Sequence, residues 1–375
     1  MKVPLALLED WMRQYYFAVD FDLGSSGVED YSLADLRPML GIEQDDLDRI
    51  VFHDSQTLGG VRLRQAIADQ SGGGDPERVM ATHGSSEANF LLMNALLRPG
   101  DEVVVTDPCY PQLFLVAEAL GCRLVKVPLR PERGFRPDVD EIRDAVTSAT
   151  RMVVINFPHN PTGASVDPEG QQGIVEACDR AGSYLVWDNA FGAITYDAPP
   201  LPEATALYER ALSMGTLSKT YGLPGLRVGW CLAAPAVLQE MIRFRDYITL
   251  HLSPLVEMIA SRAIEESERL IGPRREQCRR NLEILAAWCD ARPRALAWSR
   301  PRGGSCIFPR LLEVADVEAF CHRLAREHRV MLVPGNCFGH PRHVRLGFGG
   351  PTASFVAGLE RLGPVLDEAG GPDAV

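Results

Sequence analysis

The chain has 375 residues, with 38 Lys and Arg against 50 Asp and Glu, so its formal net charge is −12. An acidic protein repels phosphate backbones and anionic lipid, which argues against nucleic-acid and membrane partners. The nine cysteines are odd in number and contain no C-x-x-C pair. This pattern argues against a zinc site or a disulfide framework and favours a reducing, cytoplasmic location.

Short β-branched runs alternate with helical stretches from about residue 77 to residue 233. We expect strands at 78–82, 102–106, 123–128, 151–156, 184–188, 211–216 and 227–233, and helices at 85–97, 111–120, 138–146 and 168–181. Continuous apolar strands between helices predict an α/β domain with a mostly parallel sheet that is covered on both faces. Binding sites in such sheets form at the carboxyl ends of the strands.

The segments outside this alternation predict a second, smaller α+β domain. The first 45 residues read as irregular, with a Gly-Ser-Ser-Gly loop at 24–27. Arg- and Glu-rich helices follow from about residue 235 to Arg292, with a break expected near Gly272-Pro273. We therefore expect a large domain over 45–250, and a small domain built from an N-terminal arm, 1–44, and the segment 251–375.

Lysine is rare, since only Lys2, Lys126 and Lys219 are present. Lys219 follows the expected strand 211–216, lies among the hydroxyls of Thr216 and Ser218, and precedes a glycine-containing loop and Arg227. A partly desolvated amine has a lowered pKa and can form a Schiff base with an aldehyde, while hydroxyls and a guanidinium can hold a phosphate. The arrangement predicts that Lys219 is a catalytic residue beside a phosphate-bearing cofactor.

The stretch from Thr216 to Gly229 resembles the lysine motif of the fold-type-I, class I/II aminotransferases, which use pyridoxal 5'-phosphate. Other motifs of that family follow its order, namely Gly84-Ser85-Ser86-Glu87-Ala88, Asp107-Pro108-Cys109-Tyr110, Asn160-Pro161-Thr162-Gly163, Asp188, Pro301-Arg302-Gly303-Gly304 and Arg345-Leu346. The resemblance covers roughly residues 45 to 362. It implies a large domain with a mostly parallel seven-stranded sheet, a smaller α+β domain, and a homodimer with its sites at the interface.

The resemblance also implies roles for single residues. Asp188 would keep the pyridine nitrogen protonated, so that the ring accepts electrons from a substrate carbanion. Arg345 would bind the substrate α-carboxylate with its two-pronged guanidinium. The family's remaining cofactor contacts fall on Ser85, Ser86, Tyr110, Asn160, Thr216, Ser218 and Arg227. Taken alone, several of these positions also have a structural interpretation, such as a helix cap for the two serines or core packing for Tyr110.

Two positions depart from the family pattern. Phe191, three residues after Asp188, replaces a tyrosine whose hydroxyl usually contacts the ring 3-oxygen. Asp54 stands where the family has a tyrosine that reaches the phosphate of the neighbouring subunit. A carboxylate cannot serve a phosphate but could serve a cationic substrate; alternatively, Asp54 caps the turn that follows it.

These departures, together with 8–11, 25–28 and 53–55, resemble one branch of the family, the cyclases of guanidino-amino-acid antibiotic pathways. That resemblance implies a β-hydroxyarginine substrate bound by Ser26, Gly27, Asp54 and Arg345. Lys219 would remove the α-proton, the β-hydroxyl would leave, and a guanidine nitrogen would attack the β-carbon to close a six-membered ring. The alternatives are an aminotransferase for a basic or aromatic amino acid and a non-catalytic, cofactor-binding regulator.

Overall fold

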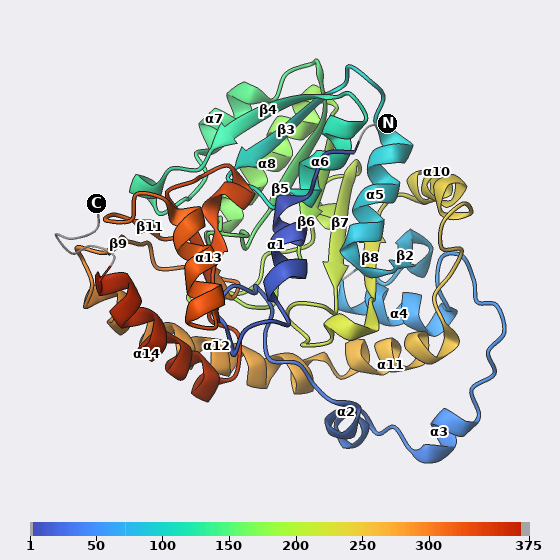
Figure 1. Ribbon diagram of the computed structural model, residues 1–375. Helices are drawn as coiled ribbons and strands as arrows, with labels where there is room; N and C mark the ends of the chain where they lie inside the picture. Colours follow the sequence, from blue (N-terminus) through green and yellow to red (C-terminus); the bar gives the residue numbers. More distant parts are fainter. Residues whose placement is uncertain (1–2, 72, 369–375) are drawn as a thin grey trace.

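A seven-stranded mixed sheet forms the centre of the computed structural model, which describes residues 3–71 and 73–368 (Figure 1). Its strands are β2 (Val79–Thr82), β3 (Glu102–Asp107), β4 (Arg123–Pro128), β5 (Thr150–Asn156), β6 (Tyr184–Asp188), β7 (Ala211–Thr216) and β8 (Gly229–Leu232). Their order is β2-β8-β7-β6-β5-β3-β4, and β8 runs antiparallel to both of its neighbours while the other pairs are parallel. The predicted fold class, with its mostly parallel seven-stranded sheet, is confirmed.

Helices cover both faces of this sheet, which explains why its strands are apolar without alternation. Val103 and Val105 belong to one hydrophobic cluster, whereas Val104 between them belongs to another. The first cluster includes residues of α5 (Gly84–Leu96), α6 (Gln112–Ala119) and α10 (Pro235–Arg245); the second includes residues of α7 (Val139–Ala145) and α8 (Pro168–Ala181). Successive side chains of one strand therefore pack against different helical layers.

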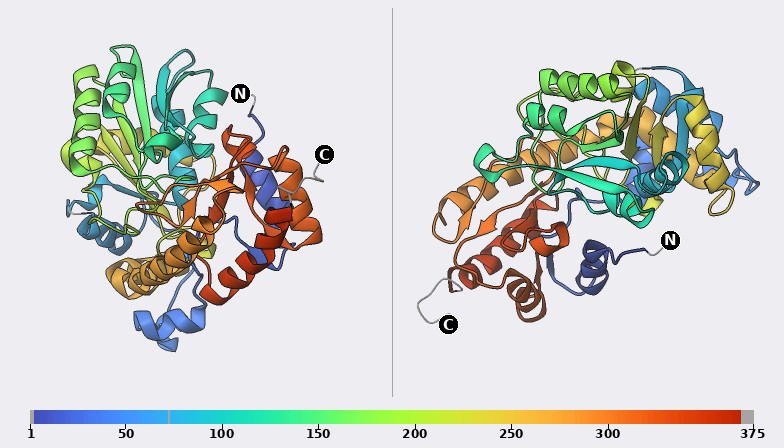
Figure 2. Two further views of the ribbon diagram at one scale, coloured as in Figure 1. Left: turned by 90° about the vertical axis from the view of Figure 1, so that its left-hand side faces the viewer. Right: turned by 90° about the horizontal axis from the view of Figure 1, so that it is seen from above.

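The C-terminal part contains short antiparallel strand pairs and long helices. Its elements are α11 (Pro254–Glu265), α12 (Ser267–Asp290), β9 (Leu296–Ala297), β10 (Cys306–Ile307), β11 (Arg310–Leu311), α13 (Val317–Glu327), β12 (Val330–Met331), β13 (Val333–Pro334), β14 (Val344–Gly347) and α14 (Thr352–Glu368). Strands β10, β14 and β13 form a three-stranded sheet. This part lies to one side of the large sheet (Figure 2).

The N-terminal segment is more regular than its sequence predicts. It contains α1 (Leu7–Tyr15), β1 (Phe21–Asp22), α2 (Leu33–Leu40) and α3 (Gln44–Asp48), and leads to α4 (Val61–Gln70). Strand β1 pairs with β12 in parallel, and Trp11 and Tyr15 of α1 contact the ring of His322 on α13. Helix α1 thus lies among the C-terminal helices, as the left view of Figure 2 shows.

Helix α2 packs in a different hydrophobic cluster from α1. Its Leu36 and Leu40 share that cluster with Leu63 of α4 and Ile259 of α11. The N-terminal arm therefore contacts both parts of the molecule, and the domain boundaries near residues 45 and 250 stay a prediction. The remaining helix of the large part is α9 (Ala204–Leu207). No helix within residues 3–71 and 73–368 has the length and apolar character that a membrane crossing requires.

The prediction of a helix break at Gly272-Pro273 is wrong. Helix α12 continues through Pro273, and the interruption lies at Glu266, between α11 and α12. Proline removes one backbone hydrogen bond, which usually ends or kinks a helix. Here Leu270, before the proline, and Cys278, after it, are buried in two different hydrophobic clusters, so packing holds both halves of the helix in place.

Candidate active site

Most of the predicted site residues gather at the carboxyl ends of the parallel strands. Asp188 ends β6, Asn160 follows β5, Tyr110 follows β3 and Lys219 follows β7. Because these four strands are parallel, their carboxyl ends meet at the same edge of the sheet. Arg345 reaches this edge from β14, where its Nη1 donates a hydrogen bond to Oδ1 of Asn160 over 3.2 Å.

Lys219 has the properties of a reactive amine. Its Nζ donates to Oγ of Ser26 over 3.2 Å. Burial, and then the positive charge of Arg345, lower the pKa of Lys219 to about 8. Roughly a tenth of such amines is neutral at pH 7, and only the neutral form attacks an aldehyde carbon. Lys126, by contrast, is exposed on β4 with its Nζ 3.8 Å from Oδ1 of Asp107, and Lys2 lies outside the described residues.

Asp188 fits a cationic nitrogen of a bound ring. Its side chain is 5% exposed, and burial raises its pKa to about 6, although a 3.0 Å hydrogen bond from the backbone N–H of Ala190 opposes this rise. A buried carboxylate of this kind is stabilised in its charged form by an N–H⁺ partner, and a protonated pyridine nitrogen would be such a partner.

A cradle suited to a phosphate lies where α5 begins. The helix starts at Gly84, so the backbone N–H groups of Ser85 and Ser86 lie at its free N-terminus. Arg227 adopts a left-handed φ of +52°, and its Nη1 donates to Oγ of Ser218 over 3.0 Å. The same guanidinium lies so close to Gly84 that a Cβ at that glycine would stand 2.5 Å from Nη2. Five of the predicted cofactor contacts could hold the phosphate, namely Ser85, Ser86, Thr216, Ser218 and Arg227, and all of them except Thr216 lie around the start of α5.

Thr216, the fifth residue, uses its hydroxyl within the loop that carries Lys219. The hydroxyl donates to the carbonyl oxygen of Val228 and accepts from the backbone N–H of Ser218, both over 3.1 Å. These bonds connect the two ends of the loop. A direct contact between Thr216 and the phosphate stays a prediction.

The N-terminal loop at 24–27 contacts both Lys219 and Arg345. The carbonyl oxygen of Gly24 accepts from Nε of Arg345 over 2.9 Å, and that of Ser26 accepts from the hydroxyl of Ser305 over 2.7 Å. Ser26 is buried, whereas the space beside the Cα of Gly27 is open. A direct contact of Ser26 or Gly27 with the substrate stays a prediction.

Asp54 is not brought to this edge within one chain. Its side chain is 99% exposed and accepts a hydrogen bond from Nε2 of His251 over 3.1 Å, so its partner is a histidine rather than the following turn. The neighbouring Ser55 donates to Oε2 of Glu257 over 2.7 Å, which fixes the segment against α11. The predicted role of Asp54 in substrate binding therefore depends on a second subunit. Phe191, the other departure, is buried next to Gly304.

The structure adds one acidic residue that sequence reasoning did not assign to the site, namely Glu9 of α1. Its Oε1 accepts hydrogen bonds from the hydroxyl of Tyr110 and from Nε2 of Gln112, both over 3.1 Å. The only signal in the sequence was the Leu-Glu-Asp-Trp run at 8–11, which did not by itself show that this acid reaches Tyr110, 101 residues away.

Three comparisons with known proteins show which proteins this chain is similar to. The family model for aminotransferase class I and II matches residues 51–362. Capreomycidine synthase from Streptomyces vinaceus is 45% identical over 368 residues, which cover 97% of this chain and 94% of that protein. Arginine–pyruvate transaminase AruH from Pseudomonas aeruginosa is 31% identical over 306 residues, covering 79% of this chain and 77% of the relative. The crystal structure of the PLP-dependent cyclase OrfR superposes with a TM-score of 0.93 at 43% identity and covers 98% of each chain.

Proposed function

The chain belongs to the aminotransferase class I and II family of pyridoxal-5'-phosphate enzymes, and we propose that it converts a β-hydroxyarginine-type substrate into a capreomycidine-type cyclic guanidino amino acid in antibiotic biosynthesis. The observation that carries this proposal is the likeness to capreomycidine synthase, which extends over 97% of the chain and so includes the N-terminal arm. The solved cyclase OrfR, which covers 98% of the chain, supports the same reaction class.

The site residues fit the cofactor. Lys219 would hold its aldehyde carbon, Asp188 its ring nitrogen, and Ser85, Ser86, Ser218 and Arg227 its phosphate. When bound, pyridoxal phosphate stabilises negative charge at the substrate α-carbon. The amine of Lys219, with a pKa of about 8, is suited to take the α-proton near neutral pH.

Other residues of the chain orient the substrate. Arg345 is held by Asn160 and by the carbonyl of Gly24, so its guanidinium has a fixed direction in which to bind the α-carboxylate. The hydroxyl of Ser26 accepts from Nζ of Lys219 and would keep that amine near the α-carbon. Overall, the substrate loses its β-hydroxyl as water, while a guanidine nitrogen forms the new bond to the β-carbon and gives up a proton.

An aminotransferase acting on a basic or aromatic amino acid is the second candidate. It is favoured by the 31% identity to an arginine–pyruvate transaminase. The arginine in the name of that relative carries the same guanidino group as the substrate expected here. The two reactions differ in stoichiometry, because a transaminase consumes a keto acid and the cyclisation consumes none.

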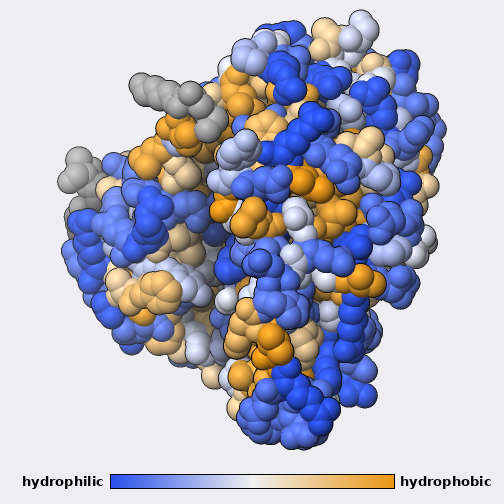
Figure 3. Space-filling model, turned by 90° about the vertical axis from the view of Figure 1, so that its right-hand side faces the viewer, coloured by the Kyte–Doolittle hydropathy of each residue, from blue (hydrophilic) through white to orange (hydrophobic). Residues whose placement is uncertain are grey.

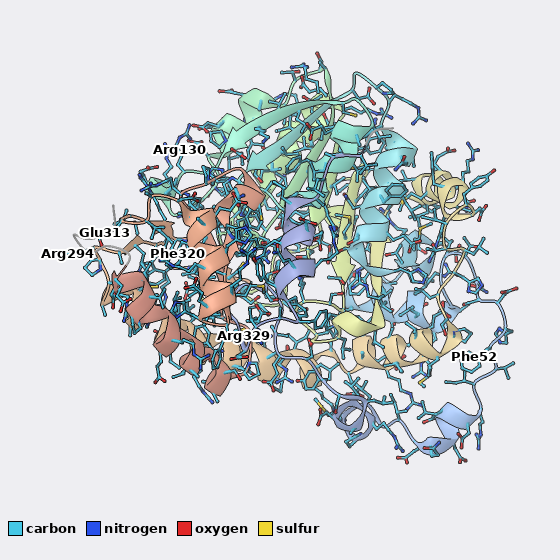
Figure 4. The ribbon with its side chains drawn as sticks, in the orientation of Figure 1. Phe52, Arg130, Arg294, Glu313, Phe320 and Arg329 are labelled. Atoms are coloured by element: carbon cyan, nitrogen blue, oxygen red, sulfur yellow. The ribbon has the colours of Figure 1, made fainter. Side chains whose placement is uncertain are left out.

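A homodimer is also part of the proposal. Large apolar side chains are exposed on the α3–α4 segment, which carries Asp54, and on the α10–α11 connection, namely Val51, Phe52, Tyr247, Ile248 and Leu250. Phe52 lies at the outer edge of the molecule (Figure 4), and the face seen in Figure 3 carries hydrophobic side chains among charged ones. Such a group of exposed apolar residues supports coverage by a second copy of the chain. The cytoplasmic location stays a prediction.

Mass spectrometry of the reaction products tests the function. We expect the holoenzyme to convert β-hydroxyarginine into a product that lacks one water and retains its α-amino group, without added keto acid. Conversion only in the presence of pyruvate, with alanine as the second product, would instead establish the transaminase. Arginine itself, which lacks the β-hydroxyl, serves as the substrate control: its α-proton should exchange with solvent deuterium without ring closure.

A further inference from the structure

The charges already assigned to the site leave a guanidino substrate without an anionic partner. Arg227 is assigned to the cofactor phosphate, Arg345 to the substrate α-carboxylate and Asp188 to the ring nitrogen, so none of these groups is left to bind the guanidinium. A guanidinium taken out of water is unfavourable unless a carboxylate pairs with it. If the proposed function holds, the protein must supply that carboxylate from some other residue.

Glu9 is held at the site by two hydrogen bonds that use only one of its oxygens. The hydroxyl of Tyr110 and Nε2 of Gln112 both donate to Oε1, and among residues 3–71 and 73–368 no hydrogen-bond donor contacts Oε2. The carboxylate is only partly buried, so Oε2 can receive a further donor. Tyr110 is one of the residues expected to contact the cofactor, which places the acid at the margin of the cofactor site.

The helix that carries Glu9 is fixed in place. Leu8, Trp11 and Tyr15 of α1 are buried, and the Tyr15 hydroxyl lies 2.5 Å from Nδ1 of His322. The carboxylate is also close enough to Lys219 to raise the pKa of that lysine, against the larger lowering effects of burial and Arg345. Glu9 is therefore a preorganised anion, on a rigid element, near the reacting amine.

We propose that Glu9 binds the guanidinium of the substrate and makes the enzyme selective for a cationic side chain. Arg345 would hold the α-carboxylate at one end of the substrate, and Glu9 the guanidinium at the other. A carboxylate matches the fork of a guanidinium, and a pair of this kind restricts where the guanidine nitrogens lie relative to the β-carbon. This assignment deepens the proposed function and depends on it.

Two other acids are less suited to this role. Asp54 is almost fully exposed and pairs with His251. Asp30 has its pKa raised by partial burial, which outweighs the lowering effect of the nearby charges of Arg274 and Lys219. His251 already binds Asp54 and Arg274 already lies near Asp30, whereas the two groups that donate hydrogen bonds to Glu9, a hydroxyl and an amide, are neutral.

The test compares arginine with citrulline, which has nearly the same shape but an uncharged urea in place of the guanidinium. Binding of each to the holoenzyme is followed by the change in cofactor absorbance. We expect the unmodified enzyme to bind arginine more tightly than citrulline by about tenfold or more. Glu9→Gln keeps an acceptor for Tyr110 and removes the charge, so we expect the preference to fall to about threefold or less.

Asp10→Asn is the matched control, because Asp10 is the next residue of the same helix and pairs at the surface with Arg13 over 2.9 Å. It should keep the preference for arginine. If Glu9→Gln lowers cofactor binding, Glu9→Asp, which retains the charge on a shorter side chain, should keep cofactor binding and part of the preference.

A preference that survives Glu9→Gln overturns the assignment, and so does a preference lost in Asp30→Asn or Asp54→Asn instead. These outcomes are distinct from a failure of the proposed function, which would appear as an unmodified enzyme that forms no cyclised product. An unmodified enzyme that binds arginine and citrulline equally would refute the role of Glu9 directly.

Discussion

Arg345 of β14 donates a hydrogen bond to the side-chain oxygen of Asn160 over 3.2 Å, across 185 residues of sequence. A second donor of the same guanidinium, Nε, binds the carbonyl oxygen of Gly24 over 2.9 Å. One buried side chain therefore connects the C-terminal sheet, the loop after β5 and the N-terminal arm. The orientation of these three segments and the direction of the guanidinium are consequently set together.

Arg345→Lys should show whether substrate binding needs only the positive charge of Arg345 or also the planar shape of its guanidinium. Lysine keeps the positive charge but loses the planar fork, so we expect amino-acid affinity to fall by about ten- to a hundredfold, or ~1.5–3 kcal/mol, with cofactor affinity nearly unchanged. The measurement is a spectral titration with arginine. Arg326→Lys, on the exposed side of α13, should have no effect. Equal affinities in the Arg345 variant and the unmodified enzyme would remove Arg345 from substrate binding.

The pKa of Lys219 predicts how cofactor loading depends on pH. Since burial lowers this pKa to about 8, the neutral amine increases as the pH rises through 8. The rate at which apoenzyme binds pyridoxal phosphate should therefore rise by about tenfold between pH 7 and pH 9 and then level off. An increase that continues past pH 10 would indicate an ordinary, solvated lysine.

Lys219→Ala should bind the cofactor without the absorbance of the lysine-bound form, whereas Lys126→Ala should load normally.

A buried ion pair between Glu87 and Arg245 stabilises the start of α5. Oε1 of Glu87 lies 3.4 Å from Nε of Arg245, whose side chain is fully buried. Burial alone would raise the pKa of Glu87, but hydrogen bonds from His83 and Thr249 and the charge of Arg245 outweigh it and lower the pKa to about 2. Glu87→Gln removes the stronger of the two carboxylate charges that act on the buried guanidinium, the other being Glu257, so we expect a loss of about 3 kcal/mol in the free energy of unfolding.

Urea unfolding measures this loss, with Glu118→Gln, at an exposed position of α6, as the control. The pH dependence has a definite sign. Because the pKa of Glu87 in the folded protein lies below that of the unfolded chain, its contribution is complete above about pH 5 and decreases as the pH falls toward 2. A Glu87→Gln variant that loses as much stability at pH 3 as at pH 7, relative to the unmodified protein, would contradict this account.

The proposed homodimer can be tested by mass and by a single substitution. One chain has a mass of 41.3 kDa, and light scattering at micromolar concentration should give twice this value. Phe52 is 75% exposed, and Phe52→Glu should shift the equilibrium toward the monomer because it places a charge in the proposed interface. Leu312→Glu, at an exposed position after β11, should leave the mass unchanged. A monomer in the unmodified protein would also remove the argument that Asp54 acts on a neighbouring site.

The large sheet could be predicted closely because local and tertiary signals agree there. Helix α8 has the predicted bounds, with an Asp167 cap at its start and Gly182 in the left-handed conformation at its end. Strands β6 and β7 also have their predicted bounds, since β-branched and apolar runs end at polar residues. The motif residues at the strand ends converge as expected, because parallel strands bring their carboxyl ends together.

The N-terminal arm could not be predicted to the same extent, because its structure depends on contacts distant in sequence. Leu8, Trp11 and Tyr15 recur at helical spacing in α1, but the sequence does not show that Trp11 and Tyr15 pack against His322 of α13. The hydrogen bond of Glu9 to Tyr110 exists only because that packing brings the helix to the sheet edge. The family pattern likewise placed Asp54 at a motif position, but it could not predict that the side chain is exposed or that it accepts a hydrogen bond from His251.

The placement of Glu9 on α1 has a consequence for how this enzyme could change its substrate. The lysine loop and the phosphate cradle are built into the central sheet, where a substitution disturbs many neighbours. Helix α1 is a short peripheral element, and Glu9 contacts the sheet side only through Tyr110 and Gln112 among the described hydrogen bonds. With Glu9 as the proposed partner of the substrate side chain, replacing this one residue would alter which side chain is accepted while the reactive amine stays where it is, although its pKa would fall because Glu9 raises it. Evolution, or a protein engineer, could thus vary the specificity of the enzyme without rebuilding the lysine loop or the phosphate cradle.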